Sequence, residues 1–320
     1  MTSQDTATAQ QQPWPLRVGA ELVGAFLICF AVYTVASFGN VIYTLNLAYA
    51  VLATGLVYAA VTYALGKVSG GQFNPAVTVA AMIVGRTKLV DGVLYIVAQV
   101  VGATLAGLLV RFLLPTSENV TLSQWLVATV NGFDKGSIAY STLSQYGLSF
   151  SINQAIVVEV VASLVIVGAA MASYGTKRYA AVTGIAYAAG AAITFPVTGA
   201  ALNPARATGI AVAVYAQGLD TEPVSQLWVF WICPVLAAAL VSLAMVLQQM
   251  IAAPKTKGDD PKTLHEYDEA ADPAGEPTAV ASESASDAEP QDGSDDQVDA
   301  EVGGEESDPK ADADEGVERH

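Results

Sequence analysis

Six stretches of this sequence are each long and apolar enough to cross a lipid bilayer. A spanning helix needs roughly 20 mostly apolar residues, because the hydrocarbon layer is about 30 Å thick. The six candidate spans are residues 18–39, 46–66, 91–112, 151–173, 179–197 and 226–251. Hydrophobic residues make up 53% of the chain and charged residues 14%, which is too apolar for an ordinary soluble domain. The sequence therefore predicts an all-α membrane protein with six transmembrane helices.

Two shorter apolar segments, residues 67–85 and 198–214, do not fit this pattern of simple spans. Each is too short to cross and too apolar for an ordinary loop, and each is interrupted by glycine and by Asn-Pro. Irregular backbone at membrane depth is tolerated only where it faces protein or a water-filled cavity. We therefore predict two re-entrant half-helices, which point to a pore.

The two broken segments carry matching motifs. The first reads Ser-Gly-Gly-Gln-Phe-Asn-Pro-Ala-Val-Thr from Ser69 to Thr78. The second reads Thr-Gly-Ala-Ala-Leu-Asn-Pro-Ala-Arg-Ala from Thr198 to Ala207. Each segment follows the second span of its half of the chain.

The chain is therefore built from two similar halves. Repeat one covers about residues 16–112 and repeat two about residues 151–251, within one channel domain of residues 16–253. A glutamate recurs in the first span of each half, at Glu21 and Glu159. Because three spans is an odd number, the second half must enter the membrane inverted, an arrangement common in transport proteins.

Each Asn-Pro-Ala predicts an N-cap followed by a helix start. Asparagine is a strong N-cap, and proline is tolerated at the first helical position. The inverted repeat should bring both starts together near the bilayer centre, where their positive dipole ends repel cations. The amide hydrogens of Asn74 and Asn203 could then donate to a passing oxygen, and the extended residues before them could offer carbonyls. Such a path suits neutral hydroxylic solutes.

The two ends of the chain have a different composition from the body. Of the 30 acidic residues, 22 lie from Lys255 onward, together with only 5 of the 14 basic residues. We predict that residues 254–320 form a disordered acidic tail, because they lack apolar residues to bury. A regulatory or partner-binding tail is the alternative. The polar residues 1–15 lack the basic start of a signal peptide and are predicted to be a disordered leader.

Cysteine and histidine are too few for a redox or metal centre. Cys29 and Cys233 both lie in apolar runs, so a disulfide framework is not expected. His265 and His320 both lie in the tail, which excludes a histidine-based site in the membrane. The chain is not expected to be an enzyme.

The distribution of basic residues predicts the orientation. An even number of spans places both termini on one side, and that side receives most of the basic residues between spans. The excess of Lys and Arg puts both termini in the cytoplasm of a cell whose plasma membrane the chain spans. The sequon at Asn119 then falls on the outer side, in the connection 113–150. Trp14 and Trp228 are expected to anchor span ends at the membrane interface.

The paired motifs resemble those of the aquaporin, or major intrinsic protein, family. Two inverted Asn-Pro-Ala motifs, one as Gly-Gly-x-x-Asn-Pro-Ala and one as Asn-Pro-Ala-Arg, form a specific match over about residues 15–251. The resemblance implies a passive, proton-excluding channel, a homotetramer with one pore in each subunit, and no cofactor. The expected partners are the lipid bilayer, water and small neutral solutes, with no nucleic acid. The pore motifs would be Asn74, Pro75, Ala76, Asn203, Pro204 and Ala205, and the pore carbonyls those of Gly70, Gly71, Gln72, Gly199, Ala200 and Ala201.

The two glutamates allow two interpretations. Intramembrane acids often mark ion or proton pathways, so Glu21 and Glu159 could serve a proton-coupled secondary transporter. The resemblance implies instead that each braces a re-entrant loop through hydrogen bonds.

The resemblance also assigns a four-residue selectivity filter, at Thr54, Ala191, Ala200 and Arg206. Water-selective members carry an aromatic residue and a histidine at the first two of these positions, and glycerol channels carry two aromatics beside the arginine. This sequence has neither set, so we expect a wide filter that passes water and small neutral solutes such as glycerol. Ala207, where glycerol channels usually have Asp, and Phe230-Trp231 favour the alternative of a strictly water-selective channel.

Overall fold

The computed structural model describes residues 12–42, 47–220 and 223–252. The chain divides into two units, Met1–Pro254 and Lys255–His320. The predicted tail 254–320 and most of the predicted leader lie outside the described residues. The first helix begins at Trp14, after Pro13, so the end of the predicted leader is already helical.

Six long helices account for the predicted spans, and each is long and apolar enough to cross a membrane. Their ends lie within four residues of the predicted ones. The described part of the chain contains helices and no strand, as the prediction of an all-α membrane protein requires. The six are α2 (Trp14–Val41), α3 (Leu47–Ser69), α5 (Leu89–Leu113), α8 (Ile152–Ser173), α9 (Tyr179–Thr198) and α11 (Pro223–Ala252).

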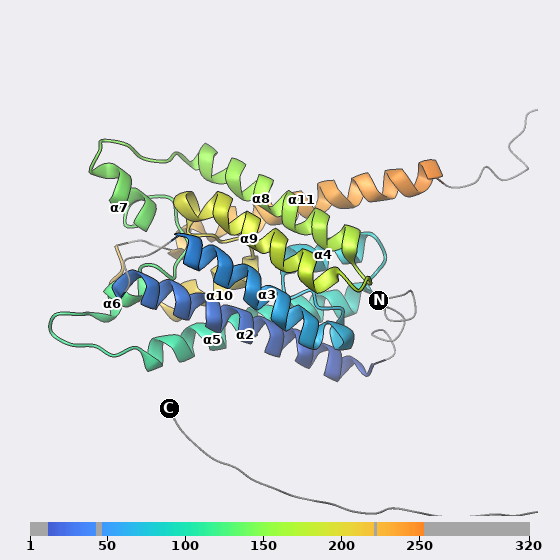
Figure 1. Ribbon diagram of the computed structural model, residues 1–320, viewed down its shortest axis with the longest axis horizontal. Helices are drawn as coiled ribbons and strands as arrows, with labels where there is room; N and C mark the ends of the chain where they lie inside the picture. Colours follow the sequence, from blue (N-terminus) through green and yellow to red (C-terminus); the bar gives the residue numbers. More distant parts are fainter. Residues whose placement is uncertain (1–11, 43–46, 221–222, 253–320) are drawn as a thin grey trace, which may run out of the picture. The chain divides into compact units, whose positions relative to one another are not determined.

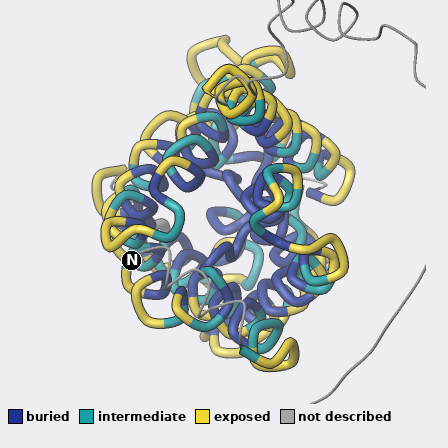
Figure 2. Tube along the Cα trace, turned by 90° about the vertical axis from the view of Figure 1, so that its right-hand side faces the viewer, coloured by how far each residue is buried: buried dark blue, intermediate teal, exposed yellow. Residues whose placement is uncertain are grey.

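The bundle exposes apolar residues on its outer surface. Figure 2 shows exposed residues around the circumference of the bundle and buried residues facing inward. The exposed residues include large apolar side chains such as Leu56 (68% exposed) on α3 and Ile232 (57% exposed) on α11. An apolar exterior is unfavourable in water but suits the hydrocarbon of a bilayer.

Two short helices complete the repeat. The re-entrant helix α4 (Pro75–Ile83) follows α3, and α10 (Pro204–Ala213) follows α9. The order α2, α3, α4, α5 is thus repeated as α8, α9, α10, α11 (Figure 1). The halves interlock, since α3 packs against α9, α4 against α11 and α10 against α5.

The connection between the halves lies at one end of the bundle and contains α6 (Leu122–Leu126) and α7 (Ile138–Ser144). We call this end the loop side. The opposite end, where α2 begins and α11 ends, we call the terminal side (Figure 1). Trp14, at the start of α2, is 58% exposed, and Trp228, near the start of α11, is 47% exposed.

A pair of glycines allows α3 and α9 to cross in close contact. A Cβ on Gly55 would lie 2.7 Å from the carbonyl oxygen of Gly184, and a Cβ on Gly184 would lie 2.6 Å from that of Gly55. No other residue fits at such distances, so the two backbones meet directly. Gly55 precedes Asn74 by the same number of residues as Gly184 precedes Asn203, so the repeat extends to this crossing.

Candidate functional site

Both half-helices begin with the predicted asparagine cap. The Asn74 side chain accepts a hydrogen bond from the backbone N–H of Ala76 at 2.8 Å, in front of α4. The Asn203 side chain accepts from Ala205 N–H at 2.9 Å, in front of α10. Each asparagine has extended backbone angles and is followed by proline as the first helical residue. The local sequence thus sets both helix starts without help from distant residues.

The two motifs contact each other directly. Nδ2 of Asn74 donates to the carbonyl oxygen of Leu202 at 3.0 Å, and Nδ2 of Asn203 donates to that of Phe73 at 2.8 Å. Both asparagines are 1% exposed. The positive ends of the two half-helices therefore meet inside the bundle, as the inverted repeat predicts.

The second amide hydrogen of each asparagine is also taken. Nδ2 of Asn74 lies 2.7 Å from the hydroxyl of Tyr187, and Nδ2 of Asn203 lies 2.9 Å from the hydroxyl of Tyr58. A side-chain amide has only two hydrogens to donate. The expectation that these hydrogens are free for a passing oxygen is therefore not met in this conformation.

The loop in front of each half-helix has strained backbone. Phe73 has φ of 48° and Leu202 has φ of 55°, in the left-handed region that side chains with a Cβ rarely adopt. Ala200 has φ of 56°. Each such residue costs of order 1–3 kcal/mol, so the surroundings must hold these loops in place.

Glu21 holds the first loop. Its carboxylate accepts from Ser69 Oγ at 2.6 Å, from the backbone N–H groups of Gln72 (3.0 Å) and Phe73 (2.7 Å), and from Gln99 Nε2 at 2.7 Å. The side chain is fully buried. The backbone of the strained residue Phe73 is thus bonded directly to the Glu21 side chain.

Glu159 makes the corresponding contacts in the second half. It accepts from Thr198 Oγ1 at 2.5 Å and from the backbone N–H of the strained Leu202 at 3.2 Å, and it is fully buried. Both side chains thus accept hydrogen bonds from the loop in front of the half-helix of their own half.

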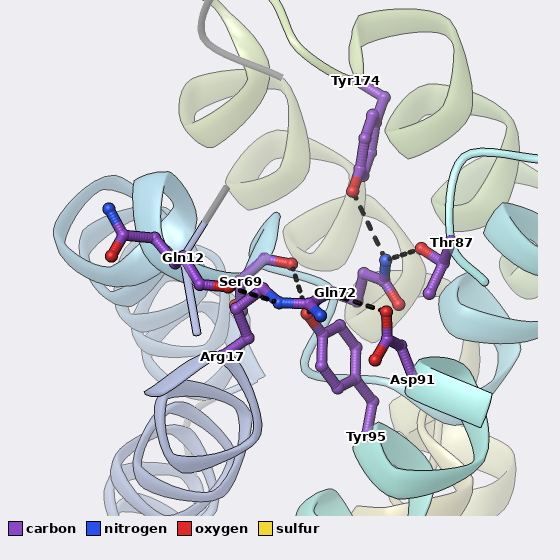
Figure 3. Close-up of polar contacts among 8 residues, drawn as sticks. All are labelled: Gln12, Arg17, Ser69, Gln72, Thr87, Asp91, Tyr95 and Tyr174. Atoms are coloured by element: carbon purple, nitrogen blue, oxygen red, sulfur yellow. Dashed lines mark hydrogen bonds and ion pairs between the residues drawn. The ribbon is translucent and has the colours of Figure 1, made fainter. Parts of the chain in front are cut away.

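Further side chains hold the first loop from the terminal side (Figure 3). The Tyr95 hydroxyl donates to the carbonyl oxygen of Ser69 at 3.1 Å, and Tyr95 lies beside an ion pair between Arg17 and Asp91 at 2.9 Å. The ion pair links α2 to α5, the two helices on which Arg17 and Asp91 lie.

Gln72 is held by two hydroxyl groups (Figure 3). Its Nε2 donates to Thr87 Oγ1 at 2.6 Å and to the Tyr174 hydroxyl at 3.4 Å. Burial raises the pKa of the Tyr174 hydroxyl above its ordinary value of about 10, so Tyr174 remains protonated at neutral pH. The side chain of Gln72 is therefore held by Thr87 and Tyr174.

Arg206 follows the second motif and is buried without an acidic partner among the described residues. Its Nη1 donates to Asn131 Oδ1 at 2.5 Å and its Nη2 to the carbonyl oxygen of Gly199 at 3.2 Å. Within the described residues its Nε has no partner. The Tyr33 hydroxyl donates to the Arg206 carbonyl oxygen at 2.6 Å, which fixes the backbone here.

Comparison with known proteins identifies the family. The profile of the major intrinsic protein family matches residues 10–245. The chain belongs to the major intrinsic protein family. It is 31% identical to aquaporin Z of Photorhabdus laumondii over 222 residues, which is 69% of this chain and 91% of that protein. It is 30% identical to aquaporin Z of Brucella melitensis over 233 residues, which is 70% of this chain and 93% of that protein.

A solved structure has the same fold. The aquaglyceroporin from Plasmodium falciparum aligns with a TM-score of 0.56 and 16% identity, over 72% of this chain and 95% of that chain. This likeness concerns the fold alone. Members of the major intrinsic protein family are membrane channels and not enzymes, and the described residues contain no cluster of potential metal ligands.

The four positions assigned to the family's selectivity filter are all buried. Thr54 is 8% exposed, Ala191 1%, Ala200 5% and Arg206 3%. Ala191 and Ala200 belong to one apolar cluster, and Arg206 reaches the loop through Gly199. The Thr54 hydroxyl donates to the carbonyl oxygen of Ala50 in its own helix at 2.8 Å. Thr54 therefore adds little polarity, and Arg206 is the main donor of the set.

The six proposed pore carbonyls fall into two groups. The Gly71 carbonyl accepts from the Tyr179 hydroxyl at 3.0 Å, the Gly199 carbonyl accepts from Asn131 and Arg206, and the Ala201 carbonyl accepts from the backbone N–H of Asn203. The second group accepts no hydrogen bond from the described residues: Gly70, Gln72 and Ala200.

Sequence reasoning missed the tyrosines and Asn131. Tyr58 and Tyr187 each precede a motif asparagine by sixteen residues, so extending the repeat backwards would have paired them. Asn131 lies in a connection without periodicity, and nothing in the sequence links it to Arg206.

Proposed function

We propose that the chain is a passive channel for water and small neutral solutes such as glycerol, and that it excludes protons and ions. The observation that carries this proposal is the meeting of two half-helix N-termini through Asn74 and Asn203. Two positive dipole ends at the bilayer centre oppose the passage of cations. A neutral solute is not repelled by these positive helix ends.

The polar groups along the path support a hydroxylic permeant. The carbonyls of Gly70, Gln72 and Ala200, which accept no hydrogen bond from the described residues, are acceptors, and the Arg206 guanidinium is a fixed donor. A solute with hydroxyl groups can use both kinds of group as it moves. Pore selectivity depends on the diameter of the pore and on the donors that line it. Three of the four filter positions, Thr54, Ala191 and Ala200, carry small side chains, so the filter beside Arg206 has room for a polyol.

A strictly water-selective channel is the rival within the family. It is favoured by the relatives named aquaporin Z, by Ala207 and by Phe230-Trp231. Phe230 is buried against Phe133, with ring centroids 6.5 Å apart, and Trp231 Nε1 donates to Thr208 at 2.9 Å. Because these two aromatics pack beside α10 and outside the four filter positions, we give them less weight.

We further propose a homotetramer in the plasma membrane, with the terminal side in the cytoplasm. The excess of basic residues at that end supports this orientation. The residues concerned are Arg17, Lys67, Arg86, Lys88, Lys177 and Arg178.

Stopped-flow light scattering of proteoliposomes tests the proposal. Shrinkage driven by sucrose reports water flux, and the reswelling that follows shrinkage in glycerol reports solute flux. We expect both rates to exceed those of empty liposomes, with no added ion conductance. Water flux without glycerol flux would support the water-selective rival, and solute movement driven uphill by a proton gradient would support a coupled transporter.

A further inference from the structure

The middle of the bundle contains a stacked pair of tyrosines. Tyr58 on α3 and Tyr187 on α9 have ring centroids 3.3 Å apart and ring planes inclined by 8°. They are 2% and 1% exposed. Rings at van der Waals distance leave no space for a solute between them. The close crossing of α3 and α9 at Gly55 and Gly184, one helical turn away, brings the two rings together.

The pair is joined to the two asparagine caps by two side-chain hydrogen bonds that cross between the halves. The Tyr58 hydroxyl accepts from Asn203 of the second half, and the Tyr187 hydroxyl accepts from Asn74 of the first. The hydroxyls thus occupy the positions at which a solute oxygen would meet the amide hydrogens.

The same faces of α3 and α9 carry polar residues on the terminal side of the pair. Thr62 follows Tyr58 by one turn and Thr183 precedes Tyr187 by one turn, both toward the terminal side. Both threonines are buried. The Thr183 hydroxyl interacts with the hydroxyl of Tyr179, whereas the Thr62 hydroxyl has no partner within the described residues. Buried hydroxyls are nearly always hydrogen-bonded, so Thr62 requires a mobile partner such as water.

A cavity between α3 and α9 lies on the terminal side of the pair. Its volume is about 320 Å³, and its lining includes Thr62, Gly66 and Tyr179, with Lys67 and Lys177. Neither Tyr58 nor Tyr187 lines it. The nearest lining residue to the stacked rings along α3 is Thr62, one helical turn from Tyr58.

We infer that Tyr58 and Tyr187 form the narrowest part of the transport path and determine which solutes cross its centre. This inference rests on the proposed channel function. A solute passes only when the rings separate, and it then meets two tyrosine hydroxyls and the amides that they release. Water needs a smaller separation than glycerol, so the pair slows glycerol more than water. The selectivity filter of Thr54, Ala191, Ala200 and Arg206 is then not the only part of the path that selects solutes by size.

Two double variants separate ring size from hydrogen bonding. Tyr58→Leu/Tyr187→Leu removes the stacked rings, and Tyr58→Phe/Tyr187→Phe keeps the rings but removes the hydroxyls. Tyr49→Leu is the matched control, because Tyr49 lies on α3 and is 48% exposed. Water and glycerol permeability would be measured by stopped flow, scaled to the amount of folded protein in the liposomes.

We expect the double Leu variant to raise the ratio of glycerol to water permeability about tenfold, equivalent to about 1.4 kcal/mol of barrier. The double Phe variant should keep the wild-type ratio, as should Tyr49→Leu. If the double Leu variant does not fold, the single variants Tyr58→Leu and Tyr187→Leu should each raise the ratio by a smaller factor.

The outcomes distinguish this inference from the proposed function. A wild type that conducts normally, with an unchanged ratio in the folded Leu variants, would overturn the inference alone. Folded wild type and variants that all fail to conduct water would overturn the channel proposal and the inference with it. A closed wild type that opens in the Leu variant would support both.

Discussion

The Arg206 guanidinium is held by Asn131, whose Oδ1 lies 2.5 Å from Nη1 of the arginine. Asn131 comes from the connection between the halves, on the loop side. Its Nδ2 also donates to the carbonyl oxygens of Thr198 (3.1 Å) and Gly199 (2.8 Å). One neutral side chain thus fixes both the arginine and the loop in front of the second half-helix, without cancelling the positive charge.

Replacing Asn131 should loosen this arrangement. In Asn131→Ala, buried groups of Arg206 and Thr198 lose their partner, and each unsatisfied buried group costs about 1–3 kcal/mol. We expect a lower thermal unfolding temperature, measured by circular dichroism in detergent. Asn119→Ala is the control, because Asn119 is exposed on the same connection. Equal unfolding temperatures for the two variants would contradict the assigned role.

The two glutamates should contribute unequally to stability. Glutamine has one oxygen acceptor where glutamate has two, so either Gln variant leaves loop donors unpaired, at about 1–3 kcal/mol for each buried group. Glu21 accepts from four groups, two of them backbone N–H. We therefore expect Glu21→Gln to lower folded yield and unfolding temperature more than Glu159→Gln does.

The Gln variants also test the coupled-transporter alternative. If the glutamates only brace the loops, the flux per folded channel should not depend on a pH gradient, either in the wild type or in Glu159→Gln. Proton-driven accumulation of solute that is lost in the variant would show that the carboxylate carries protons.

The features that could be predicted from the sequence are those with local signals. Asn74-Pro75 and Asn203-Pro204 specify a cap and a helix start within a few residues, and the six spans follow from apolar length. The repeated motif also placed the half-helices against each other. These features need no knowledge of tertiary contacts.

The features that could not be predicted depend on contacts between distant segments. In the sequence, Tyr58 and Tyr187 look like ordinary core aromatics on apolar helices. Only the crossing of α3 and α9 brings their hydroxyls within hydrogen-bonding distance of the asparagines. Asn131 is 75 residues from Arg206 along the chain, and a connection has no periodicity to fix its path. The prediction of free asparagine amides was wrong for this conformation for the same reason.

A negative charge at the centre should weaken the barrier to cations. In Asn203→Asp, the carboxylate cannot donate to Phe73 or Tyr58, and it places a charge beside the positive helix ends. We expect cation leak in planar bilayers, or loss of folded protein. Asn119→Asp adds the same charge on the exposed connection. It should change neither the cation conductance nor the amount of folded protein. Normal water flux without ion conductance in Asn203→Asp would contradict a central electrostatic barrier.

The last prediction concerns the ring around Arg206. Thr54 and Ala191 lie on the loop-side turns of α3 and α9, next to Tyr58 and Tyr187, and both are small. Larger side chains there should narrow the ring without touching the asparagine caps. We expect Thr54→Phe/Ala191→His to abolish glycerol flux and to retain water flux, because selectivity follows diameter and lining donors. The measurement is stopped-flow scattering with sucrose and then glycerol, and Tyr49→Phe, on the outer face of α3, is the control. A variant that conducts glycerol as the wild type does would contradict the filter assignment.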